Sequence, residues 1–159
     1  MSMQRAKQQG FTLIELMIVI AIIMVLAMII VPQANNKIMM SHEIAATRQI
    51  NTIQVEETQY YSQFQRYAVS LAELGPPASG AAGPQAADLI PKVLADGVNT
   101  GYVFTLAATP SGYAINANPQ KFGSSGRRSF YSDESLVVRE NWGAEPASKN
   151  SPPFNQAVK

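Results

Sequence analysis

The carboxylate of Glu15 lies in a segment where charged groups are rare. Residues 11–31 form a run of 21 residues in which only Thr12 and Glu15 are polar. As a helix this run is about 31 Å long, close to the thickness of the hydrocarbon core of a bilayer. An ionised side chain in the middle of such a segment costs roughly 2.5–3.5 kcal/mol. We therefore expect Glu15 to have a partner of opposite charge.

A cut in the chain would supply that partner. No basic residue lies nearby on the same helix, because Lys7 is about two turns upstream. Cleavage after Gly10 leaves an α-amino group on Phe11, and two buried opposite charges are better tolerated together than apart. Between two staggered helices the amine of Phe11 and the carboxylate of Glu15 can meet directly. We therefore expect the ion pair between Phe11 and Glu15 to set the register between assembling copies, while apolar packing supplies the affinity.

The residues around this cut resemble a known processing site. Residues 7–16 read KQQGFTLIEL, Arg5 and Lys7 make the leader basic, and Pro32 follows the apolar run. Over residues 5–35 the chain resembles type IV prepilins and the pseudopilins of type II secretion. The resemblance implies cleavage between Gly10 and Phe11 by a prepilin peptidase and N-methylation of Phe11. It also implies that Glu15 aligns subunits, and that the helix loosens or kinks at Pro32.

Two other interpretations of the apolar run are open. A secretory signal has a shorter apolar region followed by a small-residue cleavage site, and no such site follows here. A plain signal anchor fits the length but leaves Glu15 unexplained. In either case the basic leader predicts that the N-terminal end stays in the cytoplasm and that the C-terminal part crosses. We expect a single-pass protein of the inner (cytoplasmic) membrane that later enters an extracellular pilus or a periplasmic pseudopilus.

The helical pattern continues well beyond the apolar run. Ile50, Ile53, Tyr60 and Phe64 recur at helical spacing between polar residues. We expect a cleaved leader at 1–10, a membrane and filament-core helix at 11–31, and the amphipathic half of the same helix at 32–64. A loop with a short helix follows at 65–100, in which Ser70 and Glu73 have the spacing of a helix cap. The aromatic residues near the helix end, from Tyr60 to Tyr67, predict a seam between the helix and the rest of the domain.

From Gly101 the apolar period shifts toward two, which is typical of strands. We predict strands at 102–108 and 113–117, a break at Asn118–Pro119, and a hairpin formed by 128–131 and 136–139. The predicted fold class is α+β: a long N-terminal helix packed on a small antiparallel sheet of three or four strands, as in the pilin fold. The β head covers 101–142, and a poorly ordered, flexible tail covers 143–159.

The composition argues against several other kinds of site. The chain has no Cys and one His, His42, so we expect no metal centre, no cofactor and no catalytic site. Twelve basic and eleven acidic side chains are scattered, which disfavours nucleic acid as a partner. Asp133 and Glu134 are interpreted as a solvated turn rather than a calcium site, and Arg127–Arg128 as a solvated loop.

These observations predict a structural subunit rather than an enzyme. The expected partners are further copies of the chain and other pilin-like subunits, a prepilin peptidase that also methylates, and an inner-membrane assembly platform. The bilayer is the partner before assembly. Two alternatives remain open: a type II secretion pseudopilin that drives protein export, and a signal-anchored binding or sensor domain that never polymerises.

Overall fold

The computed structural model describes residues 11–155, without the side chains of residues 30–32. The predicted leader and the last four residues lie outside the described residues. The chain divides into two compact units, Met1–Asn36 and Lys37–Lys159, which we call the N-terminal unit and the head. One helix, α1 (Leu13–Phe64), contributes to both.

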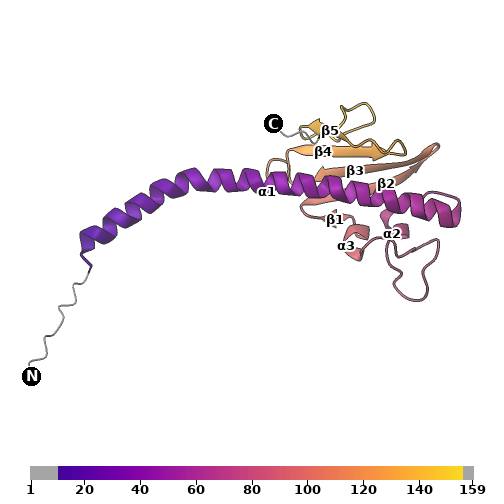
Figure 1. Ribbon diagram of the computed structural model, residues 1–159, viewed down its shortest axis with the longest axis horizontal. Coiled ribbons are helices and arrows are strands. Elements are labelled where there is room, and N and C mark those ends of the chain that lie inside the picture. The colour runs from indigo at the N-terminus through magenta and orange to yellow at the C-terminus, as the bar shows by residue number, and fades with distance from the viewer. Residues whose placement is uncertain (1–10, 156–159) are drawn as a thin grey trace, which may run out of the picture. The chain divides into compact units, whose positions relative to one another are not determined.

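The elements confirm the predicted α+β class, a pilin-like architecture of one long helix and a small antiparallel sheet (Figure 1). The five strands lie in the order of the sequence, and each is antiparallel to its neighbour. Two short helices precede the sheet. Their bounds, with those of the strands, are α2 Leu71–Leu74, α3 Lys92–Ala95, β1 Val98–Asn99, β2 Tyr102–Thr109, β3 Gly112–Pro119, β4 Arg128–Asp133 and β5 Arg139–Trp142.

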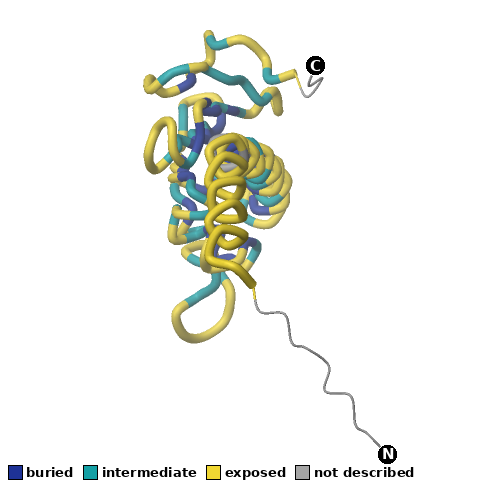
Figure 2. The backbone as a smooth tube through the Cα atoms, turned by 90° about the vertical axis from the view of Figure 1, so that its left-hand side faces the viewer, coloured by how far each residue is buried: buried dark blue, intermediate teal, exposed yellow. Residues whose placement is uncertain are grey.

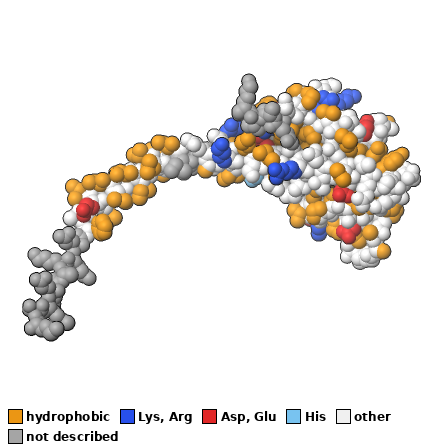
Figure 3. All heavy atoms as spheres, viewed as in Figure 1, with side chains coloured by type: hydrophobic (Ala, Val, Ile, Leu, Met, Phe, Trp, Pro, Cys, Tyr) orange, Lys and Arg blue, Asp and Glu red, His pale blue; other side chains and the backbone are white. Residues whose placement is uncertain are grey.

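In the N-terminal unit α1 is apolar on every side. From Leu13 to Ile29 each residue is exposed, so these side chains pack against nothing in their own chain (Figure 2). Figure 3 shows this part of the helix covered by hydrophobic side chains. A helix that is apolar all round belongs in a membrane or in the core of a larger assembly. By length and composition α1 is able to cross a bilayer.

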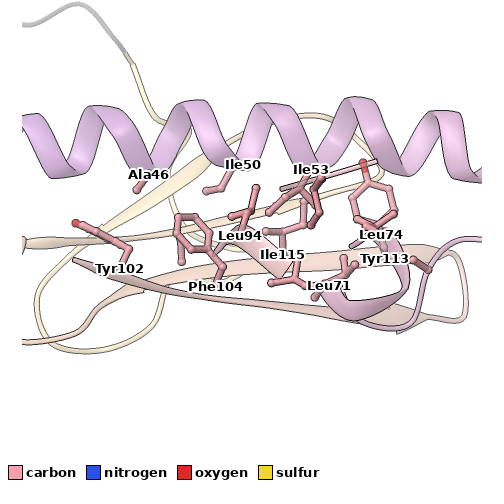
Figure 4. Packing of buried hydrophobic residues seen from close by; sticks show 14 of the residues in the cluster. Ala46, Ile50, Ile53, Leu71, Leu74, Leu94, Tyr102, Phe104, Tyr113 and Ile115 are labelled. Atoms are coloured by element: carbon pink, nitrogen blue, oxygen red, sulfur yellow. The ribbon is translucent and has the colours of Figure 1, made fainter. Parts of the chain in front are cut away.

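In the head, one face of α1 supplies the core. Ala46, Ile50 and Ile53 recur every three or four residues and are buried (Figure 4). They face side chains of β2, in which Tyr102, Phe104 and Leu106 alternate with exposed residues as a half-covered strand requires. The sheet therefore holds α1 by one face, and the opposite face of the helix stays exposed.

The predicted aromatic seam is present at the end of α1. The rings of Tyr60 and Phe64 lie 4.7 Å apart, and Tyr67 stacks on Tyr61 at 4.7 Å and on Tyr113 of β3 at 5.1 Å. These contacts join the helix, the connection that follows it and the sheet.

Two strand boundaries differ from the prediction. The break expected at Asn118–Pro119 is wrong, because β3 continues through both residues. Pro119 is tolerated there because β4 pairs only with 114–117, so the end of β3 needs no donor toward that side. The last strand begins at Arg139 rather than Leu136, because Leu136 has a positive φ of 61° that a strand cannot accommodate.

The prediction of a flexible tail from Gly143 is wrong for the described residues. Ser129 Oγ donates to the carbonyl of Glu145, and Phe154 N donates to the carbonyl of Val138. The Phe154 ring meets Phe130 edge-on at 5.5 Å. These contacts place the polar, Pro-rich segment against the sheet, which its average composition did not predict.

The short helix α2 begins where the sequence predicts, but its cap is different. Ser70 occupies the N-cap position without a side-chain bond to the helix. Glu73 Oε2 instead accepts bonds from Val69 N, Arg66 and Tyr60 Oη. The carboxylate thus ties the end of α1 to α2, which is a different role from the predicted capping box.

Arg128 is buried, so its predicted place in a solvated loop is wrong. Its guanidinium lies 2.7 Å from Glu43 of α1 and 2.9 Å from Glu140 of β5. It also lies over the ring of Trp142, 4.7 Å from the centroid. Glu43 Oε1 accepts the backbone N–H of Arg127 as well. This network fixes the position of β4 along α1.

A second buried carboxylate, Glu57, faces the connection after α1. Its side chain is 0% exposed, and Oε2 accepts the backbone N–H of Ala68 at 3.0 Å. Oε1 is buried without a hydrogen-bond partner. Burial raises the pKa of Glu57 to about 7; the bond from Ala68 and the charge of Arg66 lower it, and the charge of Glu73 raises it. The folded head therefore favours the protonated form of Glu57.

We predict that Glu57→Gln removes a pH dependence of stability. Between the ordinary pKa of 4.5 and about 7, the folded chain holds more protons than the unfolded chain. Stability therefore falls as pH rises through that window, by roughly 3 kcal/mol at most. Thermal unfolding of the detergent-solubilised chain at pH 5 and pH 8 measures this. Glu56→Gln, at a partly exposed neighbour, should keep the wild-type dependence. An unchanged pH profile in Glu57→Gln would contradict the assignment.

Arg128→Ala should destabilise the head by about 3–5 kcal/mol, because it leaves Glu43 and Glu140 without their buried partner. Denaturant unfolding followed by Trp142 fluorescence measures the loss. Lys121→Ala, at an exposed residue, should change stability by less than about 0.5 kcal/mol. Equal effects of the two substitutions would refute the buried network.

Candidate processing and assembly site

The first turn of α1 is built around Thr12 and Glu15. Thr12 precedes the first helical residue, and the backbone N–H of Glu15 approaches its hydroxyl at 3.3 Å. Glu15 Oε2 reaches back and accepts both the backbone N–H and the hydroxyl of Thr12, each at 2.8 Å. These reciprocal bonds form a capping box, which satisfies donors that the start of a helix leaves open.

This cap was not predicted for Glu15, which was expected to have only an interchain role. The signal was present, since Thr12 and Glu15 have the spacing Thr-x-x-Glu before an apolar run. Both bonds from Thr12 go to Oε2. Within residues 11–155 no bond to Oε1 is recorded, so that oxygen is open to a donor from elsewhere. The cap and an interchain contact are therefore compatible.

Phe11 lies just outside the helix. It is 92% exposed, and helical structure begins two residues later, at Leu13. The peptide bond on the N-terminal side of Phe11 thus precedes the cap. A bond outside regular structure is accessible to a peptidase without unwinding a helix. Gly10, the other side of the predicted cut, lies outside the described residues.

The remaining sequence candidates do not join this site. Pro32 lies within α1, and the kink expected there stays a prediction. His42 Nδ1 lies 3.1 Å from the carbonyl oxygen of Ser125, which places the ring against a loop of the head rather than in solvent. Asp133 accepts two bonds from Ser135, and Glu134 accepts one from Ser111. Among the described residues no three His, Cys, Asp or Glu side chains gather as metal ligands would.

Comparison with known proteins supports the resemblance seen at the N-terminus. Residues 5–31 match the family described as the prokaryotic N-terminal methylation motif, which is the type IV prepilin-like signature. The match includes the predicted cut, Glu15 and the apolar run. No solved structure matches the chain. The chain therefore carries a prepilin-like N-terminus on one apolar helix that is compatible with a single-pass membrane anchor.

Comparing Thr12→Ala with Glu15→Leu separates the observed cap from the interchain role predicted for Glu15. Thr12→Ala removes the hydroxyl from the cap and should cost about 1 kcal/mol of helix-start stability, with filament yield mostly kept. Glu15→Leu should insert into the membrane normally yet give little sheared filament, because it also removes the interchain charge. Immunoblots of membrane and sheared fractions measure both quantities. Equal filament yields from the two variants would show that Glu15 acts only as a helix cap.

Proposed function

We propose that the chain is a structural subunit of a type IV pilus-like filament. It is cleaved after Gly10, N-methylated at Phe11 and assembled through α1. One observation carries the proposal: the matched motif leads directly into a helix whose apolar side chains from Leu13 to Ile29 find no partner in the described chain. Such a surface must be covered by lipid before assembly and by other helices afterwards.

Cleavage changes the charge at the start of the helix. Hydrolysis of the Gly10–Phe11 bond consumes water and yields a carboxylate on Gly10 and an amine on Phe11. The amine is protonated near neutral pH, and one methyl group on it leaves that charge in place. Among the described residues, Glu15 is bonded only to Thr12 of its own cap. After the cut, its Oε1 has a cation within reach on a neighbouring copy.

The energy of this contact favours one register over others. Two helices that are apolar on every side can slide past one another with little change in packing. A buried ammonium and carboxylate that miss each other each lose several kcal/mol of solvation without compensation. Assembly is therefore favoured where Phe11 of one copy meets Glu15 of the next. The leader, with Arg5 and Lys7, would keep the uncut N-terminus at the cytoplasmic face and prevent that meeting.

The partners follow from these steps. A prepilin peptidase makes the cut and the methylation, and an inner-membrane platform extracts the apolar helix from lipid. The head stays outside the membrane and forms the filament surface. A pseudopilin of type II secretion shares every one of these steps, so it remains the alternative, and the client of the filament would distinguish the two.

Mass spectrometry of the N-terminal peptide tests the proposal. In native membranes or sheared surface material the chain should begin at Phe11 and carry one methyl group on its amine. Gly10→Val should remain uncut, because it puts a branched side chain at a position where this sequence has none. Gln9→Ala serves as the matched control and should be cut normally.

Wild-type chains that keep Gly10 joined to Phe11 in cells with an active prepilin peptidase would contradict the proposal. That result would favour a signal-anchored binding or sensor domain that never polymerises.

A further inference from the structure

The outer face of α1 in the head has a shallow depression that is both apolar and basic. Met40 and Ile44 supply apolar surface, and Lys37, Ser41 and Arg48 surround them. At 100° per residue Lys37, Ser41, Ile44 and Arg48 lie on the side opposite the face that packs on the sheet, and Met40 lies at its flank. Among the described residues, neither Lys37 nor Arg48 forms an ion pair, whereas Arg66, Lys92 and Arg128 all do.

The loop after β4, residues 133–138, has the opposite character. Glu134 is exposed and is oriented by a bond from Ser111 Oγ at 2.8 Å. Leu136 is 59% exposed, and its φ of 61° is costly for a bulky residue. Strain of this kind costs roughly 1–3 kcal/mol and persists where the surroundings impose it. The loop therefore holds an apolar side chain outward next to an acidic one.

These two surfaces lie at different heights along α1. Arg128, at the start of β4, pairs with Glu43, and Ser132, near its end, is bonded by Gln54. The strand thus runs in the direction of the helix, and the 133–138 loop lies beyond the level of Gln54. The depression is centred near Ile44, ten residues earlier, which is about 15 Å along the helix axis. The loop of one copy reaches the depression of another copy only if the two are shifted along that axis.

We propose that the 133–138 loop of one copy docks in the α1 depression of another copy in the filament. Leu136 covers Met40 and Ile44, and Glu134 faces Lys37 and Arg48. The occupant is a second copy because the two surfaces match in both apolar character and charge, and because both belong to every copy. Contact between two different patches of the same chain is heterologous, and such contacts build open helical arrays when they do not close into a ring.

This inference rests on the proposed function, and it adds the contact between heads that accompanies the contact between N-terminal helices. The N-terminal segment sets the register through one charge pair. The loop and the depression would require a shift along the axis as well. The charge pair needs a shift of four residues, about 6 Å, and the loop contact needs about 15 Å, so the two contacts join a copy to different neighbours.

Cysteine cross-linking of assembled filaments tests the contact. The native chain has no Cys, so introduced thiols are the only ones present. Chains with both Ile44→Cys and Leu136→Cys should give a ladder of dimers, trimers and longer products after mild oxidation. Where disulfide geometry is not met, a short bis-maleimide reports the same proximity. Ile44→Cys with Val93→Cys, at an exposed residue of α3, is the matched control and should give no ladder.

A charge swap provides a second measurement. Arg48→Glu and Glu134→Arg should each lower filament yield roughly fivefold, because each turns an attraction between copies into a repulsion. The double variant should restore the yield, since the pair is re-formed with its charges exchanged. If Arg48 and Glu134 act only within their own copy, the double variant should show the sum of the two losses of filament yield.

The outcomes separate the two proposals. Filaments that begin at Phe11 but give no ladder specific to Ile44 and Leu136 overturn the docking contact and leave the proposed function standing. A ladder formed by the control pair would likewise overturn the docking contact. Chains that stay uncut and never assemble overturn the proposed function, and the docking contact with it.

Discussion

The apolar side chains of α1 between Leu13 and Ile29 have nothing in their own chain to pack against. This constraint determines what the rest of the molecule must do. At about 25 cal/mol per Å² of apolar surface, leaving such a segment in water is far costlier than folding a small head could compensate. The segment must therefore always be in lipid or among other helices. The head contributes a separate core, in which Ile50 and Ile53 pack on the sheet, so it can remain folded while the N-terminal unit changes surroundings.

Three carboxylates, Glu43, Glu57 and Glu15, have different kinds of partner. Glu43 is paired with Arg128, and this pair holds β4 against α1. Burial raises the pKa of Glu57 to about 7, and among the described residues its Oε1 has no hydrogen-bond partner. Glu15 is held by a cap whose bonds occupy only one of its oxygens. The first two belong to the stability of the head. Glu15 alone has capacity for a partner outside the chain, and in our account the processed Phe11 supplies it.

The sequence was most informative where a periodic pattern or a motif applied. It identified the long helix, the hairpin from Tyr102 through Ala117, and the N-terminal motif, because each depends on local chemistry. Prediction from the sequence failed where contacts between residues far apart in the chain determine the structure. Arg128 resembles a loop residue until β4 is placed beside Glu43, and the tail looks polar until Phe154 is placed against Phe130. The cap on Glu15 could have been predicted, because Thr12 and Glu15 have the three-residue spacing of a capping box.

The account depends on Glu15 meeting Phe11 of another copy rather than its own helix start. Solid-state NMR on mixed filaments measures this directly, with half the subunits carrying a ¹⁵N label on Phe and half a ¹³C label on the Glu side-chain carboxyl. Any nitrogen–carbon coupling at the Phe11 amine must then come from contact between copies. The account predicts dephasing that corresponds to an ion-pair distance of about 4 Å or less. Dephasing only in subunits carrying both labels, and none in the mixed filaments, would show that Glu15 caps its own helix and does not align copies.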